Sequence, residues 1–166
     1  MRSLTFMLSR ALACLAVAGL LLFPASSAFA AGAGAVSVTQ TFHNATQSFP
    51  TPNPCTGDLG TVTLTYNGVA HANFLTSGIG AGTGWFTFTA TGDFVFTPLD
   101  PTKPTFTGHF MAWDGENVNL QNFAATSTFV LHGTGSDGST LMFHEVFHVS
   151  VSASGITLSF DKPTCG

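Results

Sequence analysis

Short runs in which apolar and polar residues alternate recur along most of this chain, separated by clusters of Gly, Pro, Asn and Ser. Alternation with a period of two is typical of β-strands that bury one face, and the many Thr, Val and Phe residues also favour strands. No segment shows a convincing helical period. The pattern predicts an all-β fold with strands at about 36–42, 61–66, 69–76, 84–91, 94–98, 104–113, 122–132, 140–151 and 155–161.

Turn signals predict how several of these strands pair. Asn67-Gly68 is a pair that two-residue hairpin loops favour. A three-residue turn is predicted at 136–138, with a glycine at its left-handed position, and a four-residue turn at 152–155. These turns predict the partners Tyr66 with Val69, Leu131 with Phe143, Phe129 with Glu145, Val151 with Ile156, Val149 with Leu158, and Phe147 with Phe160.

The first 30 residues have the features of a secretory signal peptide. Arg2 and Arg10 make the start basic, residues 11–23 form an apolar run, and 28–30 (Ala-Phe-Ala) offer small residues before a cleavage site. The apolar run of about 13 residues is shorter than the roughly 20 that a membrane-spanning helix needs. We therefore expect removal of residues 1–30, a flexible leader at 31–35, one β-domain over 36–166, and a secreted protein without a membrane span.

Two cysteines, Cys55 and Cys165, remain once the signal peptide and its Cys14 are removed. An even number of cysteines in an exported chain predicts a disulfide. The bond would close a loop of about 110 residues and add up to about 5 kcal/mol of stability. Because Cys55 precedes an early strand and Cys165 follows the last, the bond would hold the ends of the sheet together. We predict an antiparallel up-and-down barrel of about eight or nine strands, with a β-sandwich as the alternative.

The charge of the chain argues against two classes of partner. After residue 30 the only Lys or Arg residues are Lys103 and Lys162, against eight acids, which leaves a formal charge of −6. Nucleic-acid-binding proteins carry a basic surface, and anionic membranes attract basic clusters. We therefore expect no nucleic-acid partner, and no residue pattern points to a cofactor or to an oligomeric state.

Residues 144–148 (His-Glu-Val-Phe-His) match the HExxH motif of zinc peptidases. That motif works on a helix, where residues four apart stack on one face and both imidazoles reach one metal. Here the flanking residues alternate as in a strand, which would hold His144 and His148 about 13 Å apart. One zinc ion cannot bind both at that distance. We interpret the match as a coincidence and expect no metal site there.

Four polar residues are predicted to share the barrel interior with the aromatic side chains. The Asn67-Gly68 hairpin would place Tyr66, His71 and Asn73 on one face, and Glu145 alternates in phase with Phe143. Ligand pockets combine apolar walls with a few placed polar groups, so these four are candidate ligand-binding residues. Glu145 and His71 are also candidate general acids or bases. The structural alternative is a hydrogen-bonded network inside a filled core.

Several short motifs give the chain a family resemblance. They are 53–57 (NPCTG), 64–68 (LTYNG), 107–110 (TGHF), 133–139 (GTGSDGS), 143–145 (FHE) and 149–166 (VSVSASGITLSFDKPTCG). On these motifs the chain resembles a family of small secreted bacterial two-cysteine β-proteins. The resemblance implies an exported protein with the Cys55 and Cys165 framework, and it carries over no activity, cofactor or catalytic residue.

Three functions are consistent with these features. The first is binding of a small apolar ligand in the barrel lumen by Tyr66, His71, Asn73 and Glu145. The second is an isomerase- or cyclase-type enzyme that uses Glu145 or His71 as its acid or base. The third is a structural or surface-interaction protein with a solid aromatic core. An open lumen would favour the first two, and a filled one the third.

Overall fold

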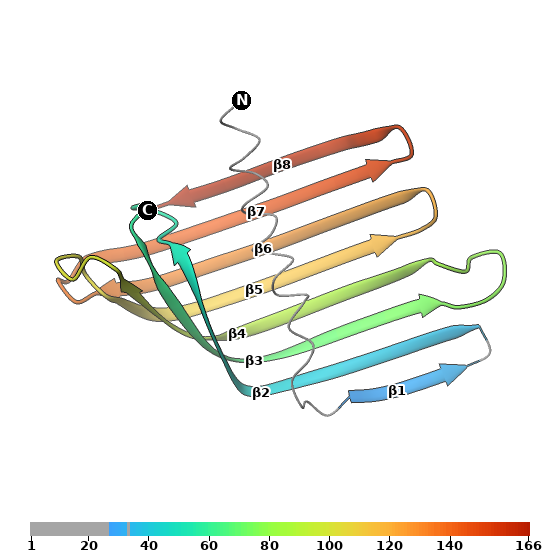
Figure 1. Ribbon diagram of the computed structural model, residues 1–166, viewed down its shortest axis with the longest axis horizontal. Helices are drawn as coiled ribbons and strands as arrows, with labels where there is room; N and C mark the ends of the chain where they lie inside the picture. The colour runs from blue at the N-terminus through green and yellow to red at the C-terminus, as the bar shows by residue number, and fades with distance from the viewer. Residues whose placement is uncertain (1–26, 33) are drawn as a thin grey trace.

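The structure is a computed structural model that describes residues 27–32 and 34–166. These residues form one antiparallel sheet in which each strand pairs with the next along the chain (Figure 1). The described residues contain no helix, and so none that is long and apolar enough to cross a membrane. The strands are β1 (Ser27–Gly32), β2 (Ala35–Pro52), β3 (Leu59–Leu75), β4 (Gly84–Pro98), β5 (Phe106–Val118), β6 (Asn122–Gly135), β7 (Thr140–Ser152) and β8 (Gly155–Cys165).

The all-β, antiparallel prediction is confirmed, and so is the turn at 136–138. Gly138 has a φ of 84°, and Leu131 pairs with Phe143, as expected. The last hairpin is only partly as predicted. Val151 pairs with Ile156, but an irregularity next to it shifts the register by one residue. Phe160 therefore lies opposite His148 instead of Phe147, and it moves to the other face of the sheet.

The predicted hairpin at Asn67-Gly68 is wrong. Both residues lie inside the continuous strand β3, where Tyr66 pairs with Ala45 of β2 and with Gly92 of β4. The segments 84–91 and 94–98 likewise merge into β4. A glycine inside an alternating segment marks either a turn or a bend in a strand, and the local sequence does not distinguish the two.

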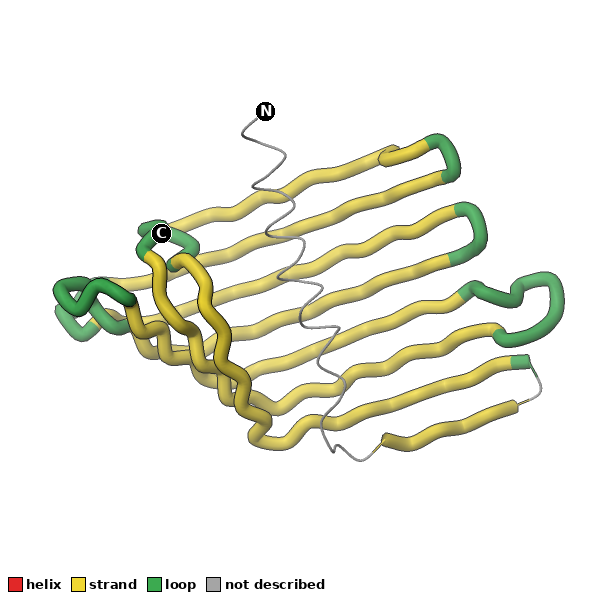
Figure 2. Tube along the Cα trace, in the orientation of Figure 1, coloured by secondary structure: helices red, strands yellow, loops and turns green. Residues whose placement is uncertain are grey.

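The long strands bend sharply along a diagonal line. In β2 the line begins at a bulge between Phe42 and Ala45, where Asn44 has a φ of 48° and its N–H donates to Asn67 Oδ1. Bulges and glycines are the devices that curve a sheet. Beyond the bend, β2 and β3 fold back across the sheet (Figure 2). The line continues on successive strands, on the same face, through Gly68, Gly92, Gly108 and Gly133.

The predicted disulfide between Cys55 and Cys165 is present, with a Cα–Cα distance of 5.7 Å. It joins the loop between β2 and β3 to the end of β8, and Cys55 Sγ lies 3.6 Å from the carbonyl oxygen of Met142. A disulfide in the structure is consistent with an extracellular protein.

The predicted barrel closure is wrong, because no ladder of hydrogen bonds joins β8 to β1 or β2. The prediction took Cys55 as a mark of the edge of the sheet. Cys55 instead follows β2, and the tip of the β2–β3 hairpin is what returns to β8. The sandwich alternative is also not observed, since all described strands belong to one sheet.

The core lies where the folded-back strands cover the sheet. Aromatic rings form a continuous chain there, with centroids 6.0–6.4 Å apart. Phe94 and Phe96 are almost completely buried beside this chain. The packing supplies the second layer that a single sheet lacks. The ring chain runs from β2 to β7 through Phe42, Tyr66, Phe88, Phe110, Phe129 and Phe143.

The predicted signal peptide lies mostly outside the described residues, which omit 1–26 and Ala33. Its expected cleavage site after Ala30 lies within β1, which pairs with β2. The expected leader at 31–35 includes the end of β1 and the first residue of β2. Cleavage after Ala30 would remove most of β1 and make the first half of β2 an edge of the sheet.

We expect Gly92→Ala to destabilise the protein by about 2 kcal/mol or more. A Cβ at Gly92 would lie only 2.1 Å from the carbonyl oxygen of Thr65, so the backbone at the bend must shift. Urea denaturation monitored by Trp fluorescence measures the change. Gly166→Ala is the matched control, because nothing lies within 4 Å of its added Cβ. Equal midpoints for the two variants would show that the bend tolerates a side chain.

Replacing both cysteines, Cys55→Ser with Cys165→Ser, is expected to lower the free energy of unfolding by about 2–5 kcal/mol. The bond anchors the folded-back hairpin, so its loss should also speed amide hydrogen exchange at Val62, a buried residue of β3 in that hairpin. Hydrogen exchange read by NMR, compared with the oxidised wild type, measures both effects. Unchanged protection at Val62 would mean that packing alone holds the hairpin in place.

Candidate functional site

Cross-strand partners define two faces of the sheet, because directly opposite residues point the same way. We call the face toward which β2 and β3 fold the concave face, and the other the outer face. Tyr66 and Glu145 lie on the concave face, in phase with Phe88 and Phe143 respectively. Burial raises the pKa of the Tyr66 phenol, whose ring belongs to the aromatic chain.

His71 and Asn73 do not join Tyr66 and Glu145, so the predicted grouping of these four residues is wrong. Because β3 runs straight through Asn67-Gly68, odd-numbered residues beyond it point to the outer face. There the His71 ring lies 3.1 Å from Ser37 Oγ and 4.8 Å from the Trp85 ring. A hairpin at Asn67-Gly68 would have reversed this assignment.

One row of partners crosses the concave face where the core ends, and we call it the border row. Every buried hydrophobic side chain of the described residues lies in this row or on the disulfide side of it. On the other side, none of the strands among residues 27–32 and 34–166 forms a second layer over the concave face (Figure 1). The border row consists of Gln40, Ala70, Phe88, Asp114, Ser127, Phe147 and Asp161.

Asp114 is an acid of the border row whose carboxyl has a raised pKa. Desolvation by burial raises the pKa of its carboxyl from 3.8 to about 6, and the nearby negative charge of Glu116 adds to the rise. Its cross-strand neighbours are Phe88 and Ser127. A carboxyl that titrates near neutral pH beside an aromatic ring can accept a hydrogen bond or exchange a proton.

Acids are concentrated on the concave face. Four of the eight acidic residues lie there, and among the described residues no Lys or Arg shares this face. Asp161 Oδ1 is buried and has no hydrogen-bond partner within the described part of the chain. The face therefore combines apolar walls with several carboxylates, a combination that attracts cationic or hydrogen-bond-donating groups. The four acids are Asp114, Glu116, Glu145 and Asp161.

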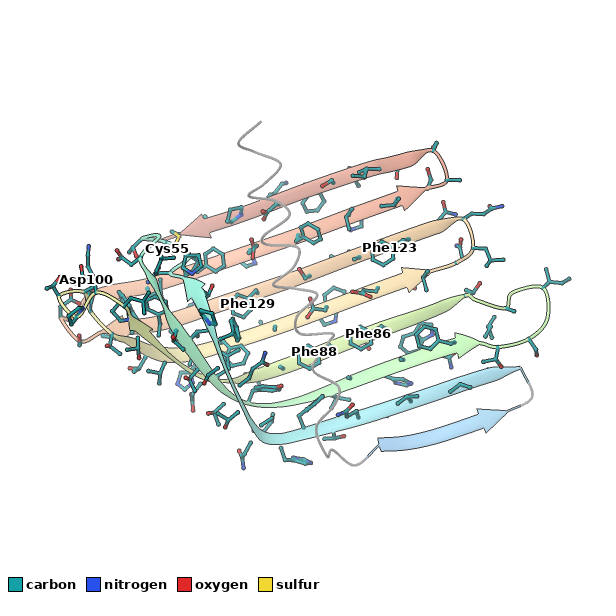
Figure 3. The ribbon with its side chains drawn as sticks, viewed as in Figure 1. Cys55, Phe86, Phe88, Asp100, Phe123 and Phe129 are labelled. Atoms are coloured by element: carbon teal, nitrogen blue, oxygen red, sulfur yellow. A yellow bond between two sulfur atoms is a disulfide. The ribbon has the colours of Figure 1, made fainter. Side chains whose placement is uncertain are left out.

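Beyond the border row the apolar pattern of the concave face continues, and no strand of the described part of the chain covers it. Phe86 and Phe123 are only partly buried there, and Phe74 is 42% exposed. Figure 3 shows labelled rings along β4 and β6, with Phe88 and Phe129 nearer the folded-back end than Phe86 and Phe123. This uncovered apolar surface and the border-row acids together form the candidate site.

The HExxH match lies on β7, as the sequence predicted, so its two histidines cannot meet at one metal. His148 Nδ1 lies 2.7 Å from Thr126 Oγ1, and its ring stacks on Phe160 at 5.5 Å. His144 is exposed on the same outer face, and Glu145 points to the concave face. The residues of the motif therefore lie on opposite faces of one strand, and His148 contacts Thr126 and Phe160.

Sequence reasoning missed Gln40, Asp114, Glu116 and Asp161. Asp114 and Glu116 alternate in phase with Phe110 and Ala112, which was a usable signal for the concave face. Asp161 could not be found this way, because the irregularity at Ser150 shifts its strand by one residue.

The raised pKa of Asp114 predicts how stability depends on pH. Between about pH 4 and 6 the folded state retains a proton that the unfolded state has released. The free energy of unfolding should therefore fall as pH rises through this window, by up to about 3 kcal/mol. Asp114→Asn should abolish this fall. Urea denaturation of both proteins at pH 4, 5, 6 and 7 is the measurement, and parallel curves would contradict the assignment.

Comparison with known proteins adds no further constraint on this site. No protein-family model, no curated protein sequence and no solved structure matches the chain. The resemblance to secreted two-cysteine β-proteins stays a prediction from the sequence motifs.

Proposed function

We propose that the protein is a secreted binding protein that holds a small apolar ligand with a cationic or hydrogen-bond-donating group. The observation that carries the proposal is that the apolar concave face extends past the end of the buried core. A second layer of strands covers the core, whereas Phe74, Phe86 and Phe123 lie beyond it. Large uncovered apolar surfaces in soluble proteins mark interaction sites.

The position of the acids supports the choice of ligand. Asp114 and Glu116 lie where the covered and uncovered parts of the face meet, next to Phe86 and Phe88. Aromatic faces and carboxylates both attract cations, and a partly buried carboxylate does so more strongly than an exposed one. A neutral or cationic apolar molecule is therefore favoured over an anionic one.

Dye binding tests the proposal. Nile blue, an apolar cation, should bind more tightly than the anionic dye anilinonaphthalene sulfonate. Phe123→Ser should weaken Nile blue binding about tenfold or more, because a phenylalanine contact contributes roughly 1.5–3 kcal/mol. Phe160→Ser is the matched control, since Phe160 lies next to the border row but on the outer face. Fluorescence titration gives both affinities.

Two results would refute this function. Tighter binding of the anionic dye would contradict the role of the acids. Equal losses in Phe123→Ser and Phe160→Ser would show that the concave face is not the site. If neither result is obtained, native mass spectrometry of the protein purified from its own culture medium should identify the natural ligand as a stoichiometric small molecule.

A second candidate function is an isomerase- or cyclase-type enzyme at the same place. It is favoured by the pKa of Asp114, which is near the value that suits a general acid or base. His71 lies on the outer face and has no part in it. Wild type and Asp114→Asn should then carry different small molecules in native mass spectrometry, because only the wild type would convert its substrate. A binding protein would carry the same molecule in both, at lower occupancy in Asp114→Asn.

A further inference from the structure

Four side chains of metal-binding type form one row on the outer face. Asp93 of β4, His109 of β5, His132 of β6 and Met142 of β7 are successive cross-strand partners. All four are exposed, and they lie on the opposite face of the sheet from Asp114. Directly opposite residues on paired strands have Cβ atoms about 5 Å apart, so neighbouring side chains of the row can hold one ion.

Asp93 orients the first imidazole of the row. Its Oδ1 lies 2.5 Å from His109 Nδ1. Because an ionised carboxylate only accepts hydrogen bonds, Nδ1 carries the proton, and the lone pair of Nε2 is directed away from the carboxylate. A carboxylate that holds one ring nitrogen while the other binds metal is the usual arrangement at histidine metal sites.

The second imidazole is His132, directly opposite His109. The described residues contain no group of three His, Cys, Asp or Glu side chains placed to hold one metal ion, so Asp93 is not counted as a third ligand beside the two imidazoles. The next partner of His132 is Met142, whose thioether sulfur is a soft ligand. The row therefore offers two nitrogen ligands and one sulfur ligand, with water able to complete the coordination.

We infer that this row is a copper site with His109 and His132 as ligands and Asp93 as the positioning residue. Copper(II) forms the most stable complexes of the divalent first-row metals with nitrogen ligands, and copper(I) accepts imidazole and thioether together. Zinc and nickel also bind imidazole, but neither favours the thioether of Met142. The exposed position of the row leaves open the coordination sites that copper(II) fills with water.

Titration of the full, untagged secreted chain with copper(II) tests the inference. Electron paramagnetic resonance should show coupling to two nitrogens. Calorimetry should give an affinity that falls tenfold or more in His132→Ala and about tenfold in Asp93→Asn, the range typical of lost ligands and of their hydrogen-bonded partners. His43→Ala is the control, because His43 is exposed at the bulge of β2, outside the row. The copper(II) affinity of His43→Ala should equal that of the wild type.

A competition assay for copper(I) tests the sulfur ligand. Met142→Leu should lower the copper(I) affinity and leave the copper(II) affinity unchanged. Equal copper(II) affinities for wild type and His132→Ala would overturn the inference, and so would tighter binding of zinc than of copper. Phe123→Ser should not change copper binding, so this inference and the proposed ligand site can fail separately.

Discussion

The bend of the sheet is the constraint on which the rest of the structure depends. A single antiparallel sheet has no partner layer, and a flat meander of this length would expose its phenylalanines on one face. The bulge at Asn44 and the glycine line through Gly92 turn β2 and β3 back over the sheet, so that one end covers itself. The disulfide between Cys55 and Cys165 then holds the returning hairpin against β8.

Covering only one end divides the concave face into two environments. Rings pack against rings on the disulfide side, whereas on the other side no described strand covers the same apolar pattern. Asp114 lies at the border and is buried enough for its pKa to rise to about 6. The proposed ligand would supply, at the uncovered end, the apolar contacts that the folded-back strands supply at the other.

The pairing register of the strands decides on which of the two faces each remaining candidate residue lies. The continuity of β3 places His71 on the outer face beside Trp85, away from Tyr66. The same alternation brings His109 and His132 together on the outer face, although 23 positions separate them along the chain. The copper inference and the ligand proposal therefore concern opposite faces of the same strands, and each can be tested without disturbing the other.

The sequence by itself determined the features that depend on neighbouring residues or on pairing chemistry. Period-two alternation predicted the strands, and the turn signal at 136–138 predicted that Leu131 pairs with Phe143. The two cysteines predicted the disulfide. Only the tertiary structure decided that Asn67-Gly68 bends a strand instead of ending it, because both conformations suit the same local sequence. It also decided that the sheet stays open and that Asp114 borders the core. Both depend on where distant strands fold back, which no local pattern encodes.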